Sequence, residues 1–116
     1  MPHLIVEVTK DLERQINVPN LVKELHLSLR GSKGLDMKRV KSRSYICDKV
    51  LNGDNAEVIS MIHVSLDVLS GRDAETKKQM GHAVYKTLKE FCKTVTQPLS
   101  LTVEVRDMDK EFYFRD

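Results

Sequence analysis

The stretch that decides the fold is residues 61–73, MIHVSLDVLSGRD. Aliphatic residues recur there at every second position, and this period of two predicts a strand with one buried face. The aliphatic positions are Ile62, Val64, Leu66 and Val68, and they alternate with Met61, His63, Ser65 and Asp67. Residues 70–73 then provide a turn and an aspartate suited to cap a helix. The stretch therefore predicts a strand, a tight turn and the start of a helix.

Downstream, the pattern changes to the period of a helix and then returns to that of a strand. The helix is expected from about 74 to 95, because one apolar stripe is formed by Met80, Ala83, Val84, Leu88 and Phe91. Alternating aliphatic residues from Leu99 to Val105 predict a final strand. The second half of the chain thus has the order β-α-β.

The first half shows the same order. Residues 4–8, LIVEV, predict a strand, and residues 40–47 predict another. Between them a helix is expected from about Pro19, with Gly31 at its end. The Asn-Gly-Asp-Asn run at 52–55 is expected to join the halves. We therefore predict one domain over residues 1–116, an internal repeat of about 1–51 and 57–116.

Two such repeats predict an α+β fold. Right-handed crossovers place both helices on one face of a single four-stranded sheet. The other face carries polar residues, namely His63, Ser65, Asp67, Ser100, Thr102 and Glu104. A face of this kind meets solvent or lines a wet interface. The small aliphatic core favours the interface, and hence an oligomer.

Composition excludes several classes of function. The 19 basic and 17 acidic residues leave a net charge of +2, which is too small for a typical nucleic-acid binder. No apolar run is long enough to span a membrane, and no signal-peptide pattern opens the chain. Cys47 and Cys92 lack metal-site spacing and are expected to be reduced thiols of a cytoplasmic protein. The histidines show no paired-ligand spacing, so we expect no metal site.

Pro2 is the first candidate for chemistry. Methionine before proline is normally removed, and removal would expose a secondary amine at the start of the first strand. Apolar burial and nearby cations both favour the neutral form of such an amine. A neutral amine near neutral pH can act as a general base. The alternative is that a proline at this position has no function.

Four cations are candidates for anion binding. Arg39, Lys41 and Arg43 are spaced by two and would share one side of a strand, where they suit the separate carboxylates of a small polyanion. The alternative is a charged edge strand that resists aggregation. Arg72 lies at the expected start of the long helix, where free N–H groups attract anions. Its alternative is a surface turn residue paired with Glu75.

The C-terminal tail carries three consecutive aromatic residues among charged ones. They are Phe112, Tyr113 and Phe114. Aromatic residues in an otherwise polar terminus suggest docking, and a neighbouring subunit beside a pocket is the expected partner.

Taken together, these features resemble the tautomerase superfamily, and within it the 5-carboxymethyl-2-hydroxymuconate Δ-isomerases. The resemblance runs over nearly the whole chain and is carried by the order of several short motifs. These are Met1-Pro2-His3, Ser42-Arg43 with Asp48, His63 with Leu66, Gly71-Arg72, Gln79 with Gly81, and Leu99-Ser100 with Glu104.

This resemblance implies a cofactor-independent isomerase of aromatic degradation that acts on a small enol bearing carboxylates. It implies a homotrimer with inward-facing sheets, Pro2 as the proton carrier, and Arg72 at the site. The arginine pair of the family corresponds to Lys41 and Arg43, so a lysine replaces its first member. Lysine keeps the charge but lacks the bidentate fork of arginine. The tail is shorter than in the family, and Phe114-Arg115 corresponds to its aromatic-basic end.

Three other interpretations remain open. The first is a tautomerase of another enol or α-keto acid, which the lysine at position 41 favours. The second is a catalytically silent interaction protein on the same fold, which would follow if Met1 were retained. The third is a small nucleic-acid binder using residues 38–43, which the low net charge disfavours.

Overall fold

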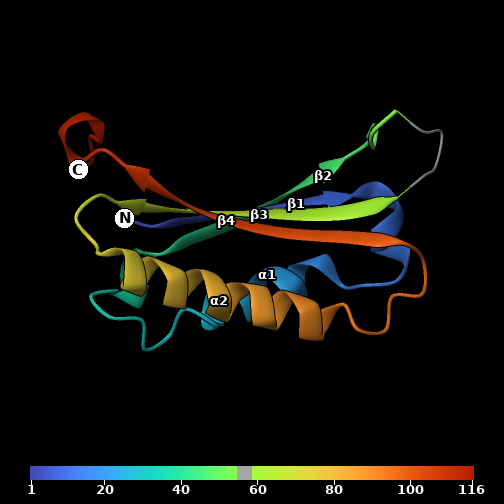
Figure 1. Cartoon of the computed structure of the whole chain (residues 1–116), viewed down its shortest axis with the longest axis horizontal. Coiled ribbons are helices and arrows are strands. Elements are labelled where there is room, and N and C mark those ends of the chain that lie inside the picture. The colour runs from blue at the N-terminus through green and yellow to red at the C-terminus, as the bar shows by residue number, and fades with distance from the viewer. Residues whose placement is uncertain (55–58) are drawn as a thin grey trace.

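Two β-α-β units meet at the centre of one sheet in the computed structural model, which describes residues 1–54 and 59–116 (Figure 1). The first unit consists of β1 (His3–Thr9), α1 (Val18–Leu27) and β2 (Lys41–Cys47). The second consists of β3 (Ser60–Leu69), α2 (Ala74–Phe91) and β4 (Leu99–Met108). The predicted order of elements is confirmed. Asn55, the last residue of the predicted junction, lies outside the described residues.

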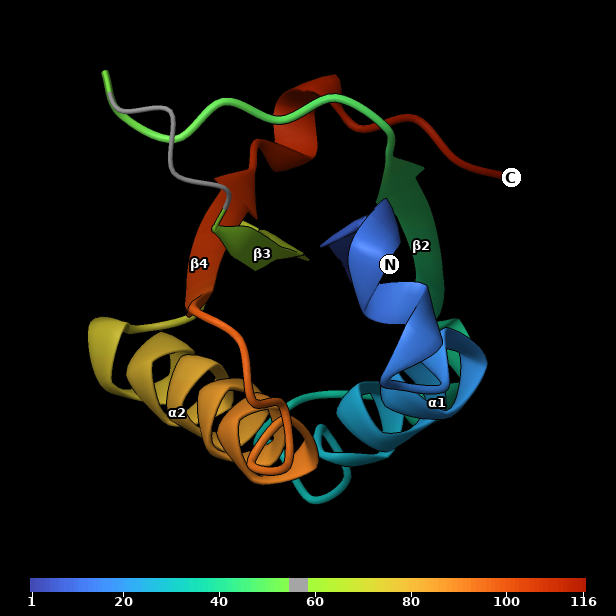
Figure 2. The ribbon, with the colours of Figure 1, turned by 90° about the vertical axis from the view of Figure 1, so that its right-hand side faces the viewer.

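The strand order is β2-β1-β3-β4. The two strands of each unit are parallel, while β1 and β3 pair antiparallel and join the units. Both helices lie on one face of the sheet (Figure 2). The predicted α+β class, with a four-stranded sheet and two helices on one face, is therefore confirmed.

The core lies between this face and the helices. Every second residue of the central strands is fully buried: Leu4, Val6 and Val8 on β1, and Ile62, Val64, Leu66 and Val68 on β3. From α2, the stripe of Met80, Val84 and Leu88 covers them. The period-two pattern places the predicted aliphatic residues of β3 inside. Of the predicted helical stripe, Met80, Val84 and Leu88 are buried, whereas Ala83 and Phe91 are half-buried.

Both helices end earlier than predicted. The chain leaves α1 through turns in which Leu29 N donates to His26 O and Arg30 N donates to Leu27 O. These tighter turns still bury Leu29 completely, so the apolar pattern continues beyond the helix. After Phe91 the same occurs, because Lys93 N donates to Glu90 O. Hydrophobic periodicity alone does not separate α-helix from these terminal turns.

The three cations predicted to share one strand lie in two different elements. Arg39 lies in the 3-10 helix η2 (Met37–Arg39), which begins where the Asp36 side chain accepts a hydrogen bond from Lys38 N. Strand β2 begins only at Lys41, after the buried Val40. The prediction that Arg39, Lys41 and Arg43 share one strand is therefore wrong for Arg39.

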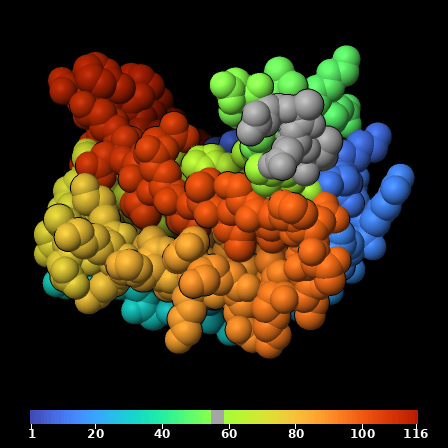
Figure 3. Space-filling model, turned by 45° about the vertical axis from the view of Figure 1, so that its right-hand side comes forward, coloured from blue at the N-terminus to red at the C-terminus, as the bar shows by residue number. Residues whose placement is uncertain are grey.

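The second face of the sheet carries no α-helix in the described part of the chain, and the short 3-10 helix η3 (Lys110–Phe112) lies on this side after β4 (Figure 2). The C-terminal segment 109–116 and residues 47–54 rise on either side of this face and border a hollow (Figure 3). On this open face His63 Nδ1 and Thr102 Oγ1 lie 2.6 Å apart. None of the helices described is long and apolar enough to cross a membrane.

Candidate functional site

Pro2 lies immediately before β1 and is buried. Its carbonyl oxygen accepts a hydrogen bond of 2.9 Å from the backbone N–H of Lys41, the first residue of β2. This bond extends the pairing of β1 with β2 and holds the start of the chain in the sheet. In the structure Met1 precedes Pro2, so the terminal amine belongs to Met1.

Three guanidinium groups act on this terminal amine. Burial lowers the pKa of the amine first, and the charges of Arg115, Arg39 and Arg72 lower it further. They come from the C-terminal segment, from η2 and from the turn before α2. Burial and each of the three charges favour loss of a proton from the amine. The surroundings of the chain end therefore favour the neutral form of the amine.

Arg72 is held by the backbone on two sides. Its Nη1 donates to Leu69 O at 3.3 Å, and its Nη2 donates to Gly34 O at 3.0 Å. The Nε atom is buried without a hydrogen-bond partner among the described residues. The turn is made by Gly71, whose φ of +117° is open to glycine but strained for other residues. These contacts fix the position of the guanidinium, whose charge lowers the pKa of the terminal amine.

Lys41 and Arg43 lie on the open face, beside His3. His3 is opposite Lys41 in the β1–β2 pairing. Arg43 Nη1 lies 3.0 Å from His3 Nδ1. Burial and then the charge of Arg43 lower the pKa of His3, while Asp67 opposes them. His3 thus links the two predicted cations to the end of the chain.

Tyr113 completes this arrangement. Its hydroxyl lies 2.8 Å from His3 Nε2, and the two rings meet edge to face, with centroids 6.0 Å apart. The predicted docking of the aromatic run therefore occurs within one chain for Tyr113. Phe112 and Phe114 are 70% and 87% exposed, and their predicted docking onto a neighbouring subunit stays a prediction.

The structure thus brings two groups of charges to one end of the sheet. Arg72 lies with the terminal amine, and Lys41 and Arg43 surround His3. Sequence reasoning assigned Arg39 to the wrong element and gave Arg115 no role beside the amine. The basic residue after the aromatic run was the signal for Arg115. Cations around a small amine can bind an anion and stabilise negative charge that develops on it.

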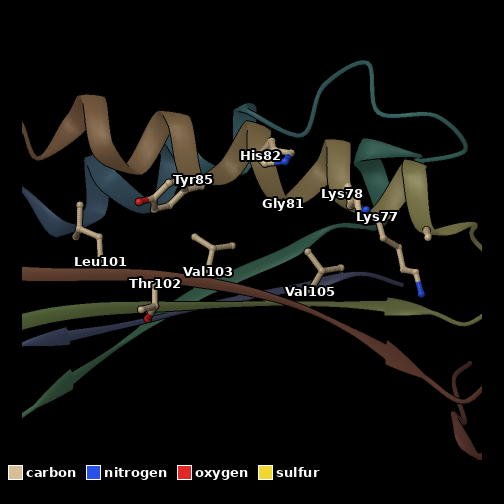
Figure 4. A pocket seen from close by; sticks show the side chains of 10 residues that line it. Lys77, Lys78, Gly81, His82, Tyr85, Leu101, Thr102, Val103 and Val105 are labelled. Atoms are coloured by element: carbon tan, nitrogen blue, oxygen red, sulfur yellow. The ribbon is translucent and has the colours of Figure 1, made fainter. Parts of the chain in front are cut away.

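A separate groove runs between α2 and β4. It has a volume of about 600 Å³, and Figure 4 shows Leu101, Val103 and Val105 pointing from β4 towards the helix. The groove is lined by Ala74, Lys77, Lys78, Gly81, His82, Tyr85 and the β4 residues 101–103 and 105. None of the predicted site residues lines it.

The family model and one relative point to the same family. Residues 2–116 match the family model of 5-carboxymethyl-2-hydroxymuconate isomerase. The chain is 21% identical to a 5-carboxymethyl-2-hydroxymuconate Delta-isomerase of Escherichia coli, over 99% of this chain and 93% of the relative.

Solved structures show the same fold. A 5-carboxymethyl-2-hydroxymuconate isomerase from Deinococcus radiodurans R1 superposes with a TM-score of 0.89 at 23% identity, over 99% of this chain and 88% of that chain. A structure described as a Q0 fused 4-OT wild type symmetric trimer superposes with a TM-score of 0.60 at 18% identity, over 93% and 86%.

Proposed function

The chain belongs to the 5-carboxymethyl-2-hydroxymuconate isomerase family and is an isomerase, and we propose that the amine of Pro2 carries the proton in its reaction. The substrate is a small 2-hydroxy-dienoate that bears carboxylates, as in 5-carboxymethyl-2-hydroxymuconate, an intermediate of aromatic degradation. No cofactor takes part. The observation that carries the proposal is that the charges of Arg115, Arg39 and Arg72 all lower the pKa of the Met1 amine, one residue before the buried Pro2.

The reaction is a proton shift that leaves the composition of the substrate unchanged. Once Met1 is removed, the neutral Pro2 amine takes the proton of the 2-hydroxyl group. The electron pair of that O–H bond forms the 2-oxo group, and the dienolate carries negative charge along its carbons. The protonated amine then returns its proton to a remote carbon, which gives the conjugated 2-oxo-enoate.

The cations have a second role in this mechanism. Arg72, Arg43 and Lys41 orient the carboxylates and stabilise the charge that spreads along the dienolate. Preorganised cations facing developing charge are often the largest catalytic contribution. The contacts of Arg72 with Leu69 O and Gly34 O support this role, because the guanidinium needs little rearrangement when substrate binds.

We further propose that the enzyme is a homotrimer whose open sheet faces point inward. The open face has exposed apolar side chains along its borders, among them Tyr45, Phe112 and Phe114. Burial of these groups between copies of the chain would stabilise an assembly. Cys47 and Cys92 are free thiols, which suits the cytoplasm.

A tautomerase of another enol or α-keto acid is the second candidate, and Lys41 favours it. A lysine binds a carboxylate as a point charge, whereas an arginine at this position would bind it with two parallel hydrogen bonds. The loss of that geometry weakens the preference for a substrate with several carboxylates.

Two measurements test the proposal. Intact mass of the natively expressed protein should show that Met1 is absent. Ultraviolet absorbance should show turnover of 5-carboxymethyl-2-hydroxymuconate that exceeds turnover of the phenylpyruvate enol. The reverse preference would favour the second candidate. Retention of Met1 would leave the Pro2 nitrogen in an amide and favour the silent interaction protein.

A Pro2→Ala variant then tests the proton carrier itself. We expect its kcat to fall strongly, because a primary amine replaces the proline nitrogen and the fixed ring is lost. Pro19→Ala is the matched control, since Pro19 lies in the first turn of α1. Full activity of Pro2→Ala would exclude proline as the proton carrier.

A further inference from the structure

The C-terminal segment 109–116 is attached to the body of the protein at two points. At the first point, Lys110 N donates to Ser70 Oγ at 3.2 Å. The Lys110 side chain also lies over Gly71, where a Cβ atom would be only 2.8 Å from Nζ. The segment therefore begins against the turn that presents Arg72.

The second point of attachment is the contact between Tyr113 and His3. The hydroxyl and Nε2 are 2.8 Å apart, and the edge-to-face rings add an aromatic contact. Tyr113 is partly buried, whereas its neighbours Phe112 and Phe114 are exposed. The tyrosine is thus the residue of the aromatic run that holds the segment against the first strand.

The contact with Arg43 determines how His3 bonds to Tyr113. A guanidinium has only N–H donors, so His3 Nδ1 must accept the hydrogen bond from Arg43 Nη1. The proton of the neutral ring is then on Nε2, and Nε2–H donates to the Tyr113 hydroxyl oxygen. Arg43 therefore selects the tautomer of His3 that binds Tyr113.

From these contacts we propose that Tyr113 and His3 are positioning residues, which hold the C-terminal segment so that Arg115 serves as a further anion-binding cation at the terminal amine. The proposal rests on the function proposed above, and the ligand is a carboxylate group of the same substrate. Neither Tyr113 nor His3 touches the reacting atoms in this scheme. Their role is to set the position of the charge two residues beyond Tyr113.

Electrostatics support this role of Arg115. After burial, Arg115 contributes more than Arg39 or Arg72 to the lowered pKa of the terminal amine. Arg39 acts from η2 and Arg72 from the turn before α2, so both stay in place if the segment moves. His3 itself faces Arg43 and Lys41 of β2, Asp67 of β3 and the amine. Release of Tyr113 would therefore remove Arg115 from the amine and leave the other cations.

The test measures the pKa of the terminal amine in the absence of substrate. The protein is labelled with 4-chloro-7-nitrobenzofurazan between pH 5 and 10, and the labelled N-terminal peptide is quantified by mass spectrometry. The labelling rate follows the fraction of neutral amine, so its midpoint reports the pKa. The peptide mass also shows whether Met1 or Pro2 carries the label.

Two variants are compared with matched controls. Tyr113→Phe removes one hydroxyl, and Arg115→Gln removes the charge. We expect each to raise the labelling midpoint by about half a pH unit, and the double variant to raise it no further. Tyr85→Phe in the groove between α2 and β4 and Arg14→Gln in the 3-10 helix that follows β1 (Lys10–Arg14) should leave the midpoint unchanged.

The outcomes separate this inference from the proposed function. A midpoint that moves in Arg115→Gln but not in Tyr113→Phe overturns the positioning role, and unchanged midpoints in both overturn the whole inference. Thermal melts of both variants check that they remain folded. Absence of isomerase turnover in the wild type would count against the proposed function, whereas the labelling midpoints are independent of turnover. With turnover present, Tyr113→Phe should raise KM for a dicarboxylate more than for phenylpyruvate enol.

Discussion

Arg72 Nη2 donates to the backbone carbonyl of Gly34 at 3.0 Å, and this bond ties the turn before α2 to the loop after α1. Residues from the two halves of the repeat therefore meet at the site. Because Nη1 also donates to Leu69 O, the guanidinium has a defined orientation before any substrate binds. Its function depends on this fork of donors as well as on its charge.

Arg72→Lys should therefore lower kcat/KM for the dienoate by about 10²-fold, a loss typical when one preorganised donor is removed. Lysine keeps the charge but cannot reach two carbonyl oxygens in the same geometry. Steady-state ultraviolet assays measure the effect, with Arg14→Lys as the control. Wild-type activity in Arg72→Lys would show that charge alone suffices.

Lys41→Arg should raise kcat/KM for 5-carboxymethyl-2-hydroxymuconate by about tenfold, because a bidentate contact discriminates by about 1–3 kcal/mol. The same change should have less effect on a substrate with a single carboxylate. Parallel assays with the two substrates give the ratio. An equal change for both substrates would contradict a contact between position 41 and the second carboxylate.

The pH dependence follows from the direction of the amine pKa shift. Burial and the charges of Arg115, Arg39 and Arg72 lower the pKa of the Met1 amine. The Pro2 amine, which becomes the chain end one residue further on, should be shifted in the same direction, and its neutral form is the base. The activity should therefore rise with pH, with a midpoint below the ordinary value of about 8. Salt at about 1 M should move the midpoint upward, since the Debye length falls to about 3 Å. A midpoint independent of salt would show that burial, and not the arginine charges, lowers the pKa of the amine.

His3 should make stability depend on pH. Its pKa is lowered in the folded state by burial and by Arg43, so the unfolded chain binds more protons below about pH 6.5. The contribution of His3 is then fully present above the unfolded pKa and declines as the pH falls through the window between the two values. Urea unfolding at pH 7.5 and pH 5 should show a larger loss for the wild type than for His3→Gln. Equal losses would contradict the direction of the shift.

Gly71→Ala should reduce the free energy of unfolding by about 1–3 kcal/mol, because a φ of +117° is strained for alanine. The added Cβ also meets Lys110 Nζ at 2.8 Å, which should displace the C-terminal segment. Gly31→Ala is the control, with a φ of +80° and nothing within 4 Å. Urea unfolding should show the greater loss for Gly71→Ala, and an equal loss would assign the whole effect to backbone strain.

Much of the fold could be predicted because its determinants are local. The alternation at 62–68 and the stripe at 80–88 report which side chains are buried, and Asp73 does cap α2 by accepting from Thr76 N. Both helix ends were predicted too late in the sequence, since turns after Leu27 and Phe91 continue the apolar pattern. Arg39 was misassigned because spacing by two does not separate a strand from a preceding 3-10 turn.

Alone, the order of residues determined the β-α-β repeat, the buried face of each strand and the candidates Pro2, Lys41, Arg43 and Arg72. Only the tertiary structure decided which charges surround the amine and that Tyr113 holds His3. The physical reason is the separation along the chain of the residues involved. Burial patterns recur within one element, whereas the approach of Arg115, Arg39 and Arg72 depends on how strands, turns and the C-terminal segment pack together.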